Sequence, residues 1–222
     1  MPGLLEVNLD PAQLYLGSGL GTNPNRPLFT ADVFERQERK YLVVEHPCSM
    51  RAGVALADSV LVAPVKEHAP LNAERWANGY YGCFPLPNLT GDGHLYVAAL
   101  DAVERCATAQ LQMSDRISCM LPIGVNLFQQ RFVWYLTRCL IATSVFDDAF
   151  GRYYEEADAI EEWVEEAVAL GVEVEEASKD ANEALSTNAN GSHQLRELLS
   201  ERQQRSFVRK EMRRLCRARY AA

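Results

Sequence analysis

The sequence has few residues of the kinds that hold metal ions or build disulfide frameworks. Its 222 residues include six cysteines, none in a Cys-X-X-Cys pair, and four histidines scattered along the chain. Isolated cysteines in a chain of this length are typical of reduced thiols, most of them small core residues. The same scattering disfavours a structural zinc site. We therefore expect no metal centre and no cofactor.

Long apolar runs and targeting signals are also lacking. The most apolar stretch, residues 132–146, is too short to span a bilayer and contains Arg138. The first residues, MPGLLEVNLD, contain neither a basic region nor a long apolar region, which disfavours export. We expect a soluble cytoplasmic protein that does not enter a membrane, with residues 132–146 in a buried helix.

The glycine-rich start of the chain does not indicate a phosphate-binding loop. The string GSGLG at residues 17–21 lacks the lysine of a P-loop and the spacing of a dinucleotide-binding motif, and no predicted strand leads into it. Together with Pro24 and Pro27, these glycines supply turns. Residues 1–27 are therefore predicted to be irregular.

The net charge of −8 conceals a strong separation of charge along the chain. Residues 147–183 carry fourteen acidic and two basic side chains, a net charge of −12. Residues 194–222 carry nine basic and three acidic side chains, a net charge of +6. The remaining charge, −2, belongs to residues 1–146. The front of the chain is therefore nearly neutral, and two oppositely charged segments follow it.

Six short runs rich in Val, Leu and aromatic residues predict strands in the first half of the chain. They cover residues 28–34, 41–45, 59–65, 80–86, 94–103 and 116–121. No helical pattern of useful length separates them, which favours a small barrel or sandwich over a parallel sheet. The predicted class is α+β, with a β-rich domain and a closing helix over residues 28–145.

The pattern changes to helical spacing after Pro122, which is well placed at a first helical position. Residues 146–171 predict an acidic amphipathic helix that ends near Gly171. Residues 172–193 lose hydrophobic periodicity and end in STNANGSH, which predicts a linker. A basic helical tail is expected over residues 194–222.

Part of the β-rich region is similar to a known family. The strings TADVF at residues 30–34 and YLVV at 41–44 resemble the opening strands of PemK/MazF-like growth-inhibitor toxins, and YVAALDAVE at 96–104 resembles a late strand. The resemblance spans about residues 28–140 and implies an SH3-like β-barrel. Toxins of this family cut RNA, using an arginine near an Arg-Pro pair after the first strand.

The sequence departs from the family pattern where the family places its catalytic residues. The pair Arg26-Pro27 precedes the expected first strand, and the loop after that strand lacks the family's glycines. No catalytic residue of the family therefore carries over to a residue of this chain.

The string EHPCSMR at residues 45–51 is the main candidate for chemistry, because it directly follows a predicted strand. His46 can serve as a general base and Arg51 can stabilise a developing phosphorane charge, as cleavage of RNA without a metal requires. Cys48 beside His46 is an alternative nucleophile. The competing interpretation is a proline-induced turn with a structural histidine and a buried thiol.

The basic tail is the main candidate for binding. The residues expected to contact nucleic acid or a partner are Arg205, Arg209, Lys210, Arg213, Arg214 and Arg217. These side chains can neutralise phosphates or the preceding acidic segment. A clasp between the two segments would also need apolar contacts from the tail, which offers Phe207, Val208, Met212 and Leu215.

Three functions remain open at this point. The leading hypothesis is a non-enzymatic binding or regulatory module of a bacterial or phage nucleic-acid-linked system. One alternative is a metal-free endoribonuclease toxin of the PemK/MazF type. The other is a structural assembly protein that docks through its C-terminal helices. The expected partner is another protein or a second copy of the chain, with nucleic acid as a further candidate.

Overall fold

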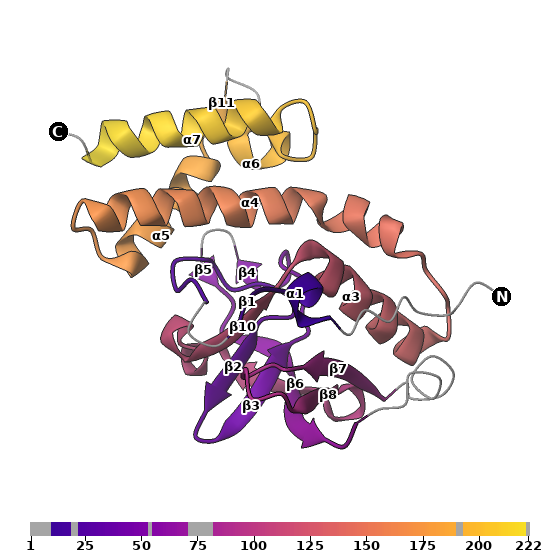
Figure 1. Ribbon diagram of the computed structural model, residues 1–222. Helices are drawn as coiled ribbons and strands as arrows, with labels where there is room; N and C mark the ends of the chain where they lie inside the picture. Colours follow the sequence, from indigo (N-terminus) through magenta and orange to yellow (C-terminus); the bar gives the residue numbers. More distant parts are fainter. Residues whose placement is uncertain (1–9, 19–21, 53–54, 71–81, 190–192, 221–222) are drawn as a thin grey trace. The chain divides into compact units, whose positions relative to one another are not determined.

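The computed structural model describes residues 10–18, 22–52, 55–70, 82–189 and 193–220 (Figure 1). The chain divides into two compact units, which are described separately. We call them the sheet unit, residues 1–23, 28–50 and 57–147, and the helical unit, residues 24–27, 51–56 and 148–222.

The sheet unit contains an antiparallel sheet. Its strands are β1 (Tyr15–Ser18), β2 (Val33–Arg36), β3 (Arg39–Val43), β6 (Ser59–His68), β7 (Cys83–Pro87), β8 (Leu95–Ala99), β9 (Glu104–Ala107) and β10 (Arg116–Met120). The order along the sheet is β1-β10-β2-β3-β6-β8-β7, and β9 pairs with the first half of β6. The long strand β6 thus joins β3 to both β8 and β9.

The hairpin of β2 and β3 has a two-residue turn. Gln37 and Glu38 both have positive φ, 49° and 63°, which is the backbone geometry of a type I′ turn. The predicted runs at residues 28–34 and 41–45 thus contribute to neighbouring strands, with Val33 opposite Leu42 and Phe34 opposite Tyr41. Phe34 and Val43 of this hairpin are buried in a core that also includes Met50 and Val62.

Helix α3 (Pro122–Thr137) follows β10 and starts with a proline, as expected. Residues 124–131 of the helix are buried, and Phe128 meets Phe84 of β7 edge to face with ring centroids 5.4 Å apart. The helix is also close to α1 (Pro11–Leu14), because a Cβ atom on Gly124 would lie 2.6 Å from the carbonyl oxygen of Leu14. Glycine permits this close approach.

Two expectations for the chain before residue 147 were wrong. Residues 1–27 were expected to be irregular, yet α1 and β1 lie within them, and β1 pairs with β10 a hundred residues later along the chain. Residues 132–146 were expected in a buried helix, yet α3 ends at Thr137, where Arg138 takes the left-handed conformation with φ of 61°. The exposed fractions of Leu136, Leu140 and Val145 are 62%, 48% and 54%.

The structure confirms the mixed α and β class that the sequence predicts, but not the predicted barrel. Each of the six expected runs contains a strand, although residues 80 and 81 of one run lie outside the described residues. The mixed α and β composition is therefore confirmed. Among the described residues, no pairing joins the terminal strands β1 and β7, so the sheet is not a closed barrel.

The described residues of the helical unit form four helices and two short hairpins. The helices are α4 (Thr143–Ala169, in this unit from residue 148), α5 (Val174–Leu185), α6 (Leu195–Leu198) and α7 (Arg205–Tyr220). The hairpins are β4 (Arg51–Ala52) with β5 (Ala55–Leu56), and β11 (Asn188–Ala189) with β12 (His193–Gln194). Gly171, with φ of 88°, ends α4 as predicted.

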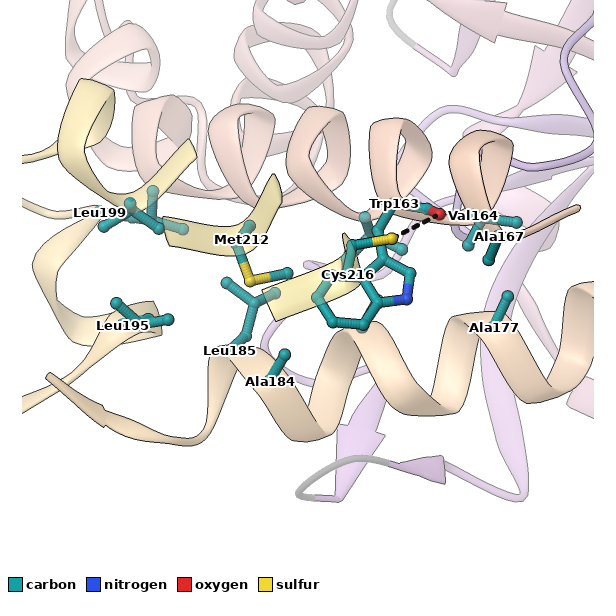
Figure 2. Close-up of a cluster of buried hydrophobic side chains, with 13 residues drawn as sticks. Trp163, Val164, Ala167, Ala177, Ala184, Leu185, Leu195, Leu199, Met212 and Cys216 are labelled. Carbon is teal, nitrogen blue, oxygen red and sulfur yellow. Dashed lines mark hydrogen bonds between the residues drawn. The ribbon is translucent and has the colours of Figure 1, made fainter. Parts of the chain in front are cut away.

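One hydrophobic cluster holds these helices together (Figure 2). Ile160, Val164 and Ala167 of α4 recur at helical spacing and are fully buried. Met212 of α7 is buried in the same cluster, and the thiol of Cys216 donates to the carbonyl oxygen of Trp163 at 3.8 Å. The unit therefore has an apolar core of its own.

The C-terminal segments differ from the expected linker and continuous tail helix. Residues 172–193 were expected to be a linker, but they contain α5, which buries Ala177, Ala181 and Ala184 together with Leu185. Small side chains give little hydrophobic signal in a sequence, although they permit close helix packing. The tail helix is interrupted between α6 and α7. Within the described part of the chain, no helix is both long and apolar enough to cross a membrane.

Candidate functional site

The turn after β3 presents the first candidate side chains, in the sheet unit. The carboxylate of Glu45 accepts a hydrogen bond from the backbone N–H of Leu61 at 2.9 Å, and the carbonyl oxygen of His46 accepts one from the N–H of Ser49 at 2.9 Å. Met50 is fully buried at the end of the turn. These contacts fix the backbone on both sides of His46 and Cys48.

The structure brings His46 and Cys48 together. The Nδ1 atom of His46 lies 2.8 Å from the Sγ atom of Cys48, and it also accepts a hydrogen bond from the backbone N–H of Cys48 at 3.2 Å. His46 is half-buried, whereas Cys48 is exposed. The turn interpretation is therefore correct in its backbone, but the thiol is not buried. In this position the imidazole can accept the thiol proton.

Arg51 belongs to the helical unit, whereas His46 belongs to the sheet unit. The Nη1 atom of Arg51 donates to Glu156 Oε1 at 2.9 Å and to Asn182 Oδ1 at 3.1 Å. Arg196 donates to the same two oxygens, at 3.2 Å and 2.9 Å. Burial lowers the pKa of Arg51, the charge of Glu156 raises it and the charge of Arg196 lowers it again.

The basic side chains of α7 meet the acidic side chains of α4, an arrangement that we call the charge ladder. The pairs are Arg205 with Glu155, Arg209 with Glu155, Asp158 and Glu162, Arg213 with Glu162, and Arg217 with Glu166. The closest contact joins Arg209 Nη2 to Glu155 Oε2 at 2.7 Å. Four of the six predicted binding residues therefore contact carboxylates of the same unit.

Sequence spacing explains why the ladder forms. The arginines of the ladder recur every four residues, which places them on one side of α7. Val208, Met212 and Cys216 precede three of them by one residue and are buried in the core. The buried apolar residues of α7 therefore form a row directly beside the row of arginines. Packing of the apolar row against the core places the arginines beside the carboxylates of α4. Phe207, which we expected in the apolar contact, is 38% exposed.

The two other predicted binding residues lie outside the ladder. Lys210 is exposed, and Arg214 pairs with Glu211 of its own helix at 2.6 Å. Sequence reasoning missed Arg26, which pairs with Asp158 of α4 at 2.8 Å and with a second carboxylate. Its Arg-Pro string gave no signal for this role, because the partner carboxylates lie more than a hundred residues away.

The described residues contain no group of three or more His, Cys, Asp or Glu side chains that could hold a metal ion. They do contain two sets of polar contacts that could take part in catalysis or binding: the His46–Cys48 pair and the arginine–carboxylate contacts of the helical unit. No protein-family model matches the chain, and no curated protein matches it in sequence.

Proposed function

We propose that this protein is a non-enzymatic binding or regulatory module whose partner is another protein, with a second copy of the chain as the simplest case. The observation that carries the proposal is the charge ladder. It occupies the arginines that a nucleic acid would otherwise contact. The positive segment of the sequence is thus neutralised within its own unit.

The energetics of the ladder disfavour nucleic acid as the ligand of the tail. A phosphate would have to displace carboxylates from Arg209, which contacts three of them. The released carboxylates would then lie beside the incoming phosphates and repel them. Counterion release would favour binding, but residues 147–183 carry −12 against the +6 of residues 194–222.

An exposed apolar surface in the sheet unit supports a protein partner. Leu136, Leu140 and Val145 lie within ten residues of one another, and each is about half exposed or more. The guanidinium of Arg138 stacks on the ring of Trp134 at 4.4 Å in the same segment. Exposed apolar side chains and aromatic rings are the residue types typical of protein interaction surfaces.

The family resemblance adds a finer proposal. We propose that the sheet is a variant of the SH3-like barrel and that the protein acts in the cytoplasm, in a bacterial or phage system linked to nucleic acid. Support comes from the antiparallel hairpin of β2 and β3, which contains the last two residues of TADVF and the first three of YLVV. The proposed role in such a system is regulation through protein contact.

The ribonuclease alternative has one observation in its favour, the ordered presentation of His46 beside Cys48. It also needs a cation for the developing charge; the Nη1 atom of Arg51 donates to Glu156 and Asn182 of the helical unit. If the alternative holds, expression of the chain arrests growth and His46→Ala relieves the arrest. Normal growth supports the binding module.

Sedimentation velocity over a range of protein concentrations tests the proposed self-association. We expect the full chain to associate, and the double variant Leu136→Ser, Leu140→Ser to stay monomeric while it remains folded. Leu170→Ser is the matched control, because Leu170 is 56% exposed in the helical unit. Monomers at every concentration for the unsubstituted chain, or equal association of all three proteins, would contradict the assignment of this surface.

A further inference from the structure

A group of polar side chains in the helical unit has more positive than negative charge. We call it the paired-arginine site: Arg51 from β4, Arg196 from α6, Glu156 from α4 and Asn182 from α5. Both guanidiniums donate to the same two oxygens, Glu156 Oε1 and Asn182 Oδ1. Four elements that are distant in the sequence therefore converge on one point.

The charge of this site is not balanced by the described protein groups. Two arginines share one carboxylate, and among the described residues Glu156 is the only carboxylate within 4.0 Å of either guanidinium. The side chains of Arg51, Glu156 and Arg196 are only 15%, 10% and 24% exposed. Two like charges held together away from water are costly unless an anion completes their neutralisation.

The arrangement differs from the charge ladder in the same unit. There four arginines meet four carboxylates, so the charges of the ladder balance. At the paired-arginine site two arginines share one carboxylate. The imbalance is thus a local property of this site and not of the acidic unit as a whole.

Some hydrogen-bond donors of Arg51 make no contact with the described protein groups. Its Nη1 atom makes both contacts, so within the described residues its Nη2 and Nε atoms donate to no protein group. The nitrogens of Arg196 are all engaged, with Nη1 donating to Ser186 Oγ at 3.2 Å. Arg51 therefore offers one edge of its guanidinium, and Arg196 supplies a second positive charge next to it.

We infer that the paired-arginine site binds a phosphate group. A tetrahedral oxyanion can accept two parallel hydrogen bonds from one guanidinium edge, and it would supply the missing negative charge. The phosphate can be inorganic or the phosphomonoester of a mononucleotide, since both present the same oxygens. This ligand goes beyond the proposed protein partner, and its binding can be measured without knowledge of that partner.

Isothermal titration calorimetry of the full chain with inorganic phosphate and with AMP tests the inference. Both titrations are compared with sodium chloride at equal ionic strength. We expect saturable binding to the unsubstituted chain and at least about tenfold weaker binding to Arg196→Gln. Arg202→Gln should bind like the unsubstituted chain, because Arg202 is 77% exposed and pairs with Asp148. Tighter binding of AMP than of phosphate would identify a nucleotide, and equal binding would identify the phosphate group alone.

Glu156→Gln provides a second, opposite test. The substitution keeps the shape of the side chain and removes the one carboxylate that competes with the ligand. We expect its phosphate affinity to rise and its melting temperature to increase more in phosphate than that of the unsubstituted chain. The inference is overturned if phosphate has no effect beyond that of chloride, or if Arg196→Gln and Arg202→Gln bind phosphate equally.

Discussion

Arg209 is the position where the charge ladder can be broken with one substitution. Its guanidinium contacts Glu155, Asp158 and Glu162 at 2.7, 3.0 and 3.3 Å. Burial alone would lower the pKa of Arg209, but the hydrogen bond with Glu155 and the charges of all three carboxylates outweigh it and raise the pKa. Arg209→Gln removes the charge and keeps a polar side chain of similar reach.

The size of the effect follows from the number of pairs and their exposure. Ion pairs at the surface contribute about 0–1 kcal/mol each, whereas hydrogen bonds to charged groups contribute about 1.5–3 kcal/mol. The Arg209 side chain is 31% exposed, so each of its three pairs belongs near the upper end of the surface range. We expect Arg209→Gln to destabilise the helical unit by about 1.5–3 kcal/mol, because three carboxylates then each lose one of their arginine partners.

Hydrogen exchange of the α7 amides measures this stability within the helical unit. The effect should shrink between about 0.05 M and about 1 M NaCl, since the Debye length falls to about 3 Å. Arg214→Gln is the matched control, because Arg214 is 63% exposed and pairs with Glu211 of its own helix; it should change stability by less than about 0.5 kcal/mol. Equal exchange in both variants at low salt would refute the ladder as a source of stability.

Three further predictions concern other parts of the molecule. Hydrogen bonds from Thr90 and from backbone and side-chain groups nearby lower the pKa of Asp92 to about 2 from an ordinary 3.8. The stabilising contribution of Asp92 is therefore present above pH 3.8 and disappears as the pH falls through 2. NMR titration should show that Thr90→Val raises the pKa of Asp92. Met212→Ala should cost about 2–5 kcal/mol in thermal or denaturant unfolding of the helical unit, because Met212 is 2% exposed, whereas Phe207→Ala at 38% exposure should cost less. Gly124→Ala should destabilise the sheet unit by about 1–3 kcal/mol in urea unfolding, because its Cβ would lie 2.6 Å from a backbone oxygen of α1; unchanged stability would contradict this packing.

Local signals in the sequence predicted much of the secondary structure. The strand runs succeeded because their side chains match a pleated, half-buried surface, and Pro122 and Gly171 marked the helix boundaries. Strand β1 was missed because its place in the sheet depends on pairing with β10, which no local pattern encodes. Helix α5 was missed because alanines form its buried face.

The candidate sites were harder to predict, since they depend on contacts between distant residues. The proximity of His46 and Cys48 was visible in the sequence because only Pro47 lies between them. The charge segregation likewise predicted a clasp as one of two open alternatives, and the ion pairs of α4 with α7 now support it. The contacts of Arg51 could not be predicted from the sequence, because its partners Glu156 and Asn182 lie 105 and 131 residues away.

The central claim is that the acidic helix occupies the arginines of α7 and so keeps them from nucleic acid. Fluorescence anisotropy with a labelled single-stranded RNA at about 0.15 M salt tests it most directly. The variant Glu155→Gln, Glu162→Gln releases ladder arginines, and Glu175→Gln, Glu176→Gln is the control with the same change in net charge on exposed positions of α5. The account predicts weak binding by the unsubstituted chain and the control, and tighter, salt-dependent binding by the ladder variant. Tight binding by the unsubstituted chain, unchanged in the ladder variant, would contradict it.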